Sequence, residues 1–109
     1  MRLPKTVKIG YTTYPVRTPA VVRDAVTKKL DDKLFGQIIY RDEYIQVRTK
    51  NTSKSKRGLI LIHEMLHGMF EAANLPHKCT EEEVIIALSP QIVMMIKDNP
   101  KLIQYIQKM

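Results

Sequence analysis

The chain has 109 residues with a single cysteine, and its 18 Lys and Arg against 11 Asp and Glu give a formal net charge of +7. This length suits one domain over residues 1–109 with a modest core. A lone cysteine excludes an internal disulfide and fits a reducing compartment. No apolar run reaches a membrane-spanning length and the N-terminus lacks a signal-peptide pattern, so we expect a cytoplasmic protein without a membrane partner.

The positive charge is concentrated in the first half of the chain. Residues 1–57 contain fourteen Lys or Arg against five Asp or Glu, whereas residues 58–109 contain four against six. A basic half can attract nucleic acid or another acidic partner. Aromatic residues are not interleaved with the basic ones as they are on base-stacking surfaces. A solvated basic surface is therefore favoured, and nucleic-acid binding remains the less favoured alternative.

The first elements are a strand and a short helix. Residues 8–16 contain β-branched and aromatic side chains, which predict a strand. Thr18 is suited to cap a helix and Pro19 to occupy its first position, so a helix is predicted from there to about residue 30.

A hairpin and a connector follow. Residues 37–40 and 44–48 are two strand-like runs joined by a short polar turn. Residues 50–57 are polar and basic without an apolar period. They predict a loop that leads into a helix, and the alternative is a rim that contacts an acidic substrate.

A long helix is predicted from about Ser55 to Asn74, since Pro76 opposes its continuation. Apolar side chains at three- and four-residue steps predict the face that this helix turns to the core. The predicted core-facing residues are Leu59, Ile62, Leu66 and Phe70.

The last third of the chain is predicted to be helical. Thr80 and Glu83 have the spacing of a capping box before the apolar run 84–88. Ser89-Pro90 then starts or kinks a further helix, and Asn99-Pro100 starts a terminal helix that ends near residue 108.

The strongest signal is an H-E-x-x-H motif inside the long predicted helix. His63 and His67 are four residues apart, so both imidazoles lie on one helical face and can reach one Zn²⁺. Glu64 lies beside them, where it can take a proton from a water at the metal. Zinc is inferred from the ligand type, because imidazole also suits other divalent metals.

The third ligand of such a site has to come from elsewhere in the chain. Counting about 100° per residue, Glu81 continues the apolar face formed by residues 84–92, where a buried carboxylate needs a partner. We therefore expect Glu81 to be the ligand. Glu82 should point more toward solvent, although the choice between the two stays open. The alternative is that Glu81, Glu82 and Glu83 bind no metal and serve only as negative charges that favour the N-terminal end of the helix dipole.

Other side chains are weaker candidates for the site. His77 is a metal-capable side chain in the loop before Thr80. It does not have the spacing of the longer motif H-E-x-x-H-x-x-G-x-x-H, whose third histidine would fall at position 73, which is Ala73. His77 or Tyr40 is a possible hydrogen-bond donor to an oxyanion or a contact to substrate, and Tyr44 is a further option. Cys79 is a rival metal ligand.

At these residues the chain resembles a small zincin of the glutamate-third-ligand type, and more closely the minimal metallopeptidase-like proteins encoded by bacteriophages and prophages. A more distant similarity is to the ImmA-type peptidases that cut repressors of mobile elements. The resemblance implies an α+β fold with a small antiparallel or mixed sheet beside the H-E-x-x-H helix, followed by C-terminal helices. It also implies zinc held by His63, His67 and a downstream glutamate, with Glu64 as general base. The segments that carry it are 11–16, 36–40, 61–68, 81–90 and 98–100.

These observations favour a zinc-dependent peptidase that acts on a peptide or protein substrate. The first alternative is a catalytically silent, zinc-stabilised module that binds another protein. The second is the basic accessory protein that binds nucleic acid. Only the enzyme needs Glu64 as a base, whereas binding that weakens steeply with salt would favour nucleic acid.

Overall fold

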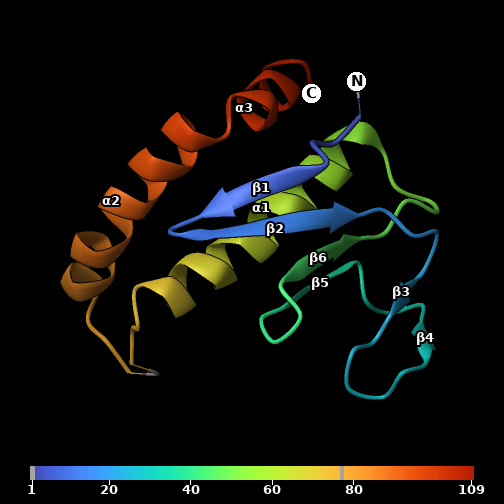
Figure 1. Cartoon of the computed structure of the whole chain (residues 1–109), viewed down its shortest axis with the longest axis horizontal. Helices are drawn as coiled ribbons and strands as arrows, with labels where there is room; N and C mark the ends of the chain where they lie inside the picture. Colours follow the sequence, from blue (N-terminus) through green and yellow to red (C-terminus); the bar gives the residue numbers. More distant parts are fainter. Residues whose placement is uncertain (1, 77) are drawn as a thin grey trace.

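The computed structural model describes residues 2–76 and 78–109, and in these residues six strands precede three helices (Figure 1). The fold class is α+β, as the sequence predicts. The elements are β1 (Thr6–Ile9), β2 (Thr12–Arg17), β3 (Val22–Arg23), β4 (Leu30–Asp31), β5 (Gly36–Ile39), β6 (Tyr44–Val47), α1 (Lys54–Ala72), α2 (Glu81–Asp98) and α3 (Pro100–Gln107).

Four of the strands form a mixed sheet in the order β1-β2-β6-β5. The pairs β1–β2 and β5–β6 are antiparallel hairpins, and β2 runs parallel to β6. The short strands β3 and β4 pair only with each other. The predicted hairpin over residues 37–48 is therefore confirmed, and β5 is left at one edge of the sheet.

The prediction of one strand over residues 8–16 is wrong, because the chain reverses inside it. Gly10 adopts a φ of +59°, a left-handed conformation that glycine tolerates without steric cost. Tyr11 follows on the turn with its side chain fully exposed. The segment thus forms the end of β1 and most of β2.

The helix predicted from Thr18-Pro19 does not form. The carbonyl of Pro19 instead accepts hydrogen bonds from the backbone N–H and the hydroxyl of Thr49, at 2.9 and 3.1 Å, which holds the backbone beside the end of the β5–β6 hairpin. Further along, the Asp24 carboxylate accepts from the N–H groups of Val26 and Thr27. This local turn competes with helix formation and closes the β3–β4 pair.

Helix α1 agrees with the prediction in its extent but not in the face that it buries. Ser53 caps its N-terminus by accepting from the Lys56 N–H at 3.1 Å. Of the residues predicted to face the core, Ile62 packs against it. Leu59, in contrast, is 63% exposed, and Leu66 and Phe70 are exposed as well.

The neighbouring stripe of α1 is the one that packs inward. Its Gly68 allows close approach of the sheet, and its Gly58 allows close approach of Tyr105 in α3. The members of this stripe are Gly58, Ile60, Leu61, Glu64, Met65, Gly68 and Met69.

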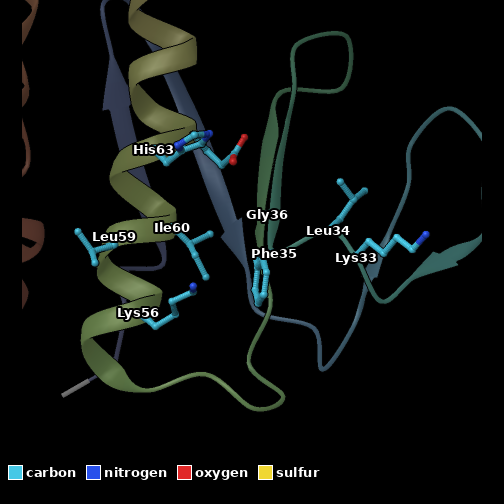
Figure 2. Close-up of a pocket in the computed structure, with 9 residues that line it drawn as sticks. Lys33, Leu34, Phe35, Gly36, Lys56, Leu59, Ile60 and His63 are labelled. Carbon is cyan, nitrogen blue, oxygen red and sulfur yellow. The ribbon is translucent and has the colours of Figure 1, made fainter.

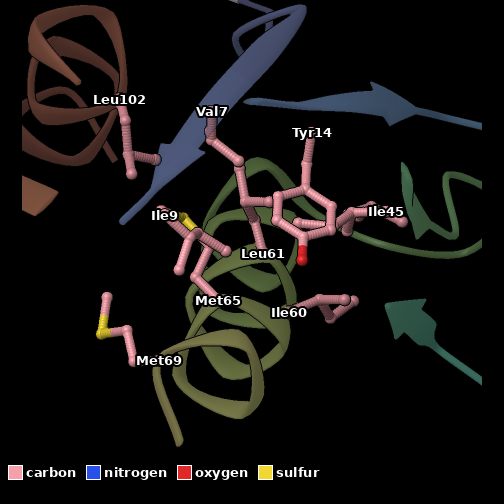
Figure 3. Packing of buried hydrophobic residues seen from close by; sticks show 10 residues of the cluster. Val7, Ile9, Tyr14, Ile45, Ile60, Leu61, Met65, Met69 and Leu102 are labelled. Atoms are coloured by element: carbon pink, nitrogen blue, oxygen red, sulfur yellow. The ribbon is translucent and has the colours of Figure 1, made fainter. Parts of the chain in front are cut away.

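The core lies between α1 and the sheet and is closed at one end by α3 (Figure 3). Packing there is close: a Cβ added to Gly68 would lie 2.7 Å from Ile9 Cδ1 of β1. The buried hydrophobic cluster consists of Val7, Ile9, Tyr14, Ile45, Val47, Ile60, Leu61, Met65, Met69 and Leu102.

The C-terminal helices largely follow the predicted boundaries. Thr80 and Glu83 form the expected capping box, with both hydrogen bonds at 3.1 Å. Pro90 lies inside one helix, α2, and does not begin a new one. Helix α3 starts at Pro100, as predicted. In residues 2–76 and 78–109, the structure contains no helix with the length and apolarity needed to cross a membrane.

Candidate metal centre

The two histidines of the motif face each other on one side of α1. Their Nε2 atoms are 3.3 Å apart, and both side chains are exposed. The ring planes meet at 75° with centroids 4.9 Å apart. Two imidazoles bound to a tetrahedral Zn²⁺ at about 2.0–2.1 Å place their nitrogens roughly 3.3–3.4 Å apart. The spacing of His63 and His67 therefore fits two ligands of one zinc ion.

Glu64 lies next to this pair but points toward the sheet. Its side chain is buried, with 8% of the residue exposed. Burial raises the pKa of the Glu64 carboxyl, while His63, His67 and a backbone hydrogen bond at Ile38 oppose the rise. A carboxylate with a raised pKa is a better proton acceptor, which is the property that a general base requires.

A pocket of about 370 Å³ lies between α1 and the segment that leads into β5 (Figure 2). The wall that α1 contributes consists of Lys56, Leu59, Ile60, His63 and Glu64, which are three or four residues apart and therefore lie on one side of the helix. The opposite wall includes an aromatic ring, Phe35, whose face is contacted by the Lys56 ammonium at 4.5 Å. The lining residues are Lys33, Leu34, Phe35, Gly36, Lys56, Leu59, Ile60, His63 and Glu64.

A second pocket, of about 430 Å³, opens beside His67. Tyr40 and Glu71 line it together with this histidine. Burial raises the pKa of the Tyr40 hydroxyl, and the nearby carboxylates, Glu71 first, add to the rise. Tyr40 thus stays protonated as a hydrogen-bond donor. Tyr44 lies elsewhere, with the Arg17 guanidinium stacked 3.7 Å over its ring.

The structure does not bring the predicted third ligand to the histidines. Glu81 and Glu82 are both exposed in the first turn of α2, so the expectation that Glu81 continues a buried face is wrong. The reason is its place along the helix: Glu81 lies about two turns before Leu88, where this side of α2 packs against the hydrophobic core. Over the part of the chain described, no three His, Cys, Asp or Glu side chains are grouped to hold a metal ion.

Two other predicted candidates add little to the site. Cys79 is a half-buried free thiol in the segment between α1 and α2. His77 lies outside the described residues.

Several residues that shape the site were not singled out from the sequence. A Cβ on Gly36 would lie 2.6 Å from Ile60 Cγ2 and 3.3 Å from Glu64 Cγ, so glycine lets β5 approach α1 here. Lys56 belongs to segment 50–57, for which a substrate rim is the alternative prediction. It lies seven residues before His63, a helical spacing that places it on the same face. Glu71, four residues after His67, could have been found by the same count. Lys33 comes from a distant loop, and no local pattern points to it.

We compared this arrangement with known proteins. No protein-family model, no curated protein and no solved structure matches the chain.

Proposed function

We propose that the chain is a zinc-dependent peptidase of the zincin type, with Glu64 as its general base. The observation that carries the proposal is the Nε2 separation of 3.3 Å between His63 and His67, beside a buried carboxylate that lines a pocket. A purely structural site has no use for a buried carboxyl with a raised pKa beside the two histidines.

His63 and His67 would supply two zinc ligands and a carboxylate downstream in the chain the third. Bound zinc would lower the pKa of a coordinated water and polarise the peptide carbonyl. Glu81 is the third ligand that the sequence favours, and reaching the histidines requires α2 or the preceding segment to move. Glu71 is the alternative carboxylate, because it already lines a pocket with His67.

Glu64 would take a proton from the attacking water and deliver it to the leaving amine nitrogen. Its position supports both transfers, since the same carboxyl lines the pocket and adjoins the histidine pair. Burial, which raises its pKa, favours proton acceptance, and the cationic surroundings limit how far the pKa rises.

Substrate would be positioned by the edge strand and by Tyr40. An extended peptide can pair with the free edge of a strand such as β5, which borders the first pocket at Gly36. The Tyr40 hydroxyl, in the pocket beside His67, would donate a hydrogen bond to the oxygen on which negative charge develops.

The decisive variant is Glu64→Gln, which keeps the shape of the side chain and removes its basicity. We expect both the variant and the unmodified protein to bind one zinc per chain, and the variant to lose at least about a hundredfold in cleavage rate. Zinc is counted by elemental analysis, and cleavage is followed with a quenched-fluorescent peptide library. Asp42→Asn, an exposed change in the β5–β6 turn, is the control and should change neither quantity.

Each contrary result has a definite meaning. A chain that takes up no zinc removes the metal centre altogether. A chain that binds zinc but cleaves no member of the library supports the binding module instead of the enzyme. Cleavage that survives in Glu64→Gln excludes Glu64 as the base.

A further inference from the structure

Helix α2 carries an apolar stripe that the rest of the structure leaves uncovered. Ile86 and Val93 are 65% and 56% exposed, and no residue of this 18-residue helix is buried. Figure 1 shows α2 at the outside of the molecule. We name as the outer stripe Glu82, Ile85, Ile86, Ser89, Ile92, Val93 and Ile96, of which the five aliphatic residues are all exposed.

The domain uses a different side of α2 for its own packing. Leu88 and Met95 are the residues of this helix that pack against the hydrophobic core. On an ideal helix the middle of the outer stripe lies about 110° around the axis from them. The outer stripe is therefore not the side through which α2 joins the domain, and an apolar surface of this kind marks an interaction site.

The outer stripe has the spacing of a helix–helix contact. Glu82, Ser89 and Ile96 repeat every seven residues along its middle. A row of isoleucines, Ile85 and Ile92, follows one side with the same period, and Ile86 and Val93 follow the other. This repeat keeps the stripe on one side of the helix along its length. Ser89, in the centre, is small enough for a second helix to approach closely.

The charges at the two ends of the stripe identify the second helix. The first turn of α2 contains Glu81, Glu82 and Glu83, and Lys97 is the basic residue of its last turn. A second copy of the same helix laid antiparallel places Glu82 of each beside Lys97 of the other. Asp98, also in the last turn, lies about 180° around the axis from the middle of the stripe. A parallel copy would set the acidic turns side by side, which is unfavourable.

We propose that two copies of the chain associate through the outer stripe of α2, antiparallel about a twofold axis at Ser89. Ile85 then faces the partner's Ile92, and Ile86 faces the partner's Val93. Glu82 lies near the partner's Lys97. The contact is isologous and closes on itself, so it yields a dimer and not a filament. This proposal is independent of zinc and of peptidase activity.

The first test is the mass of the protein in solution, measured by light scattering after size exclusion. We expect twice the 12.6 kDa of one chain. Ile86→Glu should halve the measured mass, because it puts a charge in the middle of the apolar contact. Val26→Glu is the matched control, since Val26 is equally aliphatic and 86% exposed but lies between β3 and β4. It should leave the dimer intact.

Charge exchange tests the antiparallel direction. Lys97→Glu and Glu82→Lys should each weaken the dimer, because like charges then meet at both ends of the contact. The double variant Glu82→Lys, Lys97→Glu restores opposite charges and should recover the dimer. Circular dichroism confirms that each variant keeps the helical content of the unmodified chain.

Disulfide cross-linking in a Cys79→Ser background gives an independent readout. Ser89→Cys should form a cross-linked dimer, because the two copies of this residue meet at the axis. Ile96→Cys, also on the midline of the stripe, should not cross-link with itself, since its two copies would be about 20 Å apart along the helices. A parallel dimer would cross-link at both positions.

A chain that is monomeric at sub-millimolar concentration overturns the proposal, whatever other molecule the stripe then binds. A dimer that survives Ile86→Glu places the interface on another surface and also overturns it. Cross-linking by Ile96→Cys retains a second copy as partner but contradicts the antiparallel arrangement.

Discussion

Asn99 holds the C-terminal helices against the sheet through its side-chain amide. The Lys8 N–H donates to Asn99 Oδ1 at 2.7 Å, and Asn99 Nδ2 donates to the carbonyls of Lys8 and Met95 at 3.0 and 2.9 Å. The residue is 6% exposed. Because β1 is an edge strand, the amide satisfies backbone groups that have no neighbouring strand. One side chain thereby connects the end of α2 to the sheet.

Replacing Asn99 by alanine should lower the free energy of unfolding by about 1–3 kcal/mol, because the partly buried backbone groups of Lys8 lose their partners. Urea unfolding followed by circular dichroism measures the change. Gln104→Ala, an exposed amide on α3, is the control and should change stability by less than about 0.5 kcal/mol. Equal stability of the two variants would show that the Asn99 hydrogen bonds contribute nothing net.

At the scale of the element, α1 has two apolar stripes and buries only one. The stripe with Met65 and Gly68 packs on the sheet, whereas Leu59 of the other stripe remains exposed. Glycine removes the side chain that would hold helix and strand apart, as the contact of Gly68 with Ile9 illustrates. Because α1 packs through this stripe, Glu64 points into the protein and His63 and His67 remain at the surface. The register of α1 therefore determines the geometry of the candidate metal centre.

Two leucines on α1 provide a matched test of this register. Leu61→Ala should cost about 2–5 kcal/mol of unfolding free energy, because Leu61 is fully buried and its removal leaves a cavity. Leu59→Ala should cost less than about 0.5 kcal/mol, because that side chain is largely in solvent. Thermal or urea unfolding of both variants gives the comparison. Similar losses at the two positions would contradict the register described here.

At the scale of the whole molecule, the candidate metal centre and the C-terminal helices are separate in this structure. His63 and His67 lie on α1 between two pockets, whereas Glu81 is exposed in the first turn of α2. If Glu81 completes the zinc site, metal binding ties α2 to α1 and restricts its position. Zinc would then act on the arrangement of the helices as well as on the site itself.

Added zinc should raise the melting temperature, because a ligand that binds only the folded state stabilises it, by about 2.7 kcal/mol at a hundredfold excess over Kd. His63→Ala should remove the shift. Glu81→Gln should remove most of it if Glu81 is the third ligand, with Glu82→Gln as the neighbouring control. If the zinc-induced rise in melting temperature is lost in Glu71→Gln and kept in Glu81→Gln, Glu71 is the third ligand instead. Differential scanning calorimetry with and without zinc measures all four.

The sequence by itself determined the features that depend on local spacing. The H-E-x-x-H motif placed His63 and His67 on one helical face because four residues make about one turn. The Thr80–Glu83 capping box and the hairpin over residues 37–48 were predicted correctly for the same reason: their defining contacts lie within a few residues.

Tertiary structure decided whatever depends on partners distant in the chain. The stripe that α1 buries follows from its close fit to the sheet, and Thr18-Pro19 is extended because Pro19 pairs with Thr49. Glu81 is exposed because it lies in the first turn of α2, about two turns before Leu88, where the helix packs against the core. Helical periodicity shows which residues share a face, but only the packed molecule determines which face is covered.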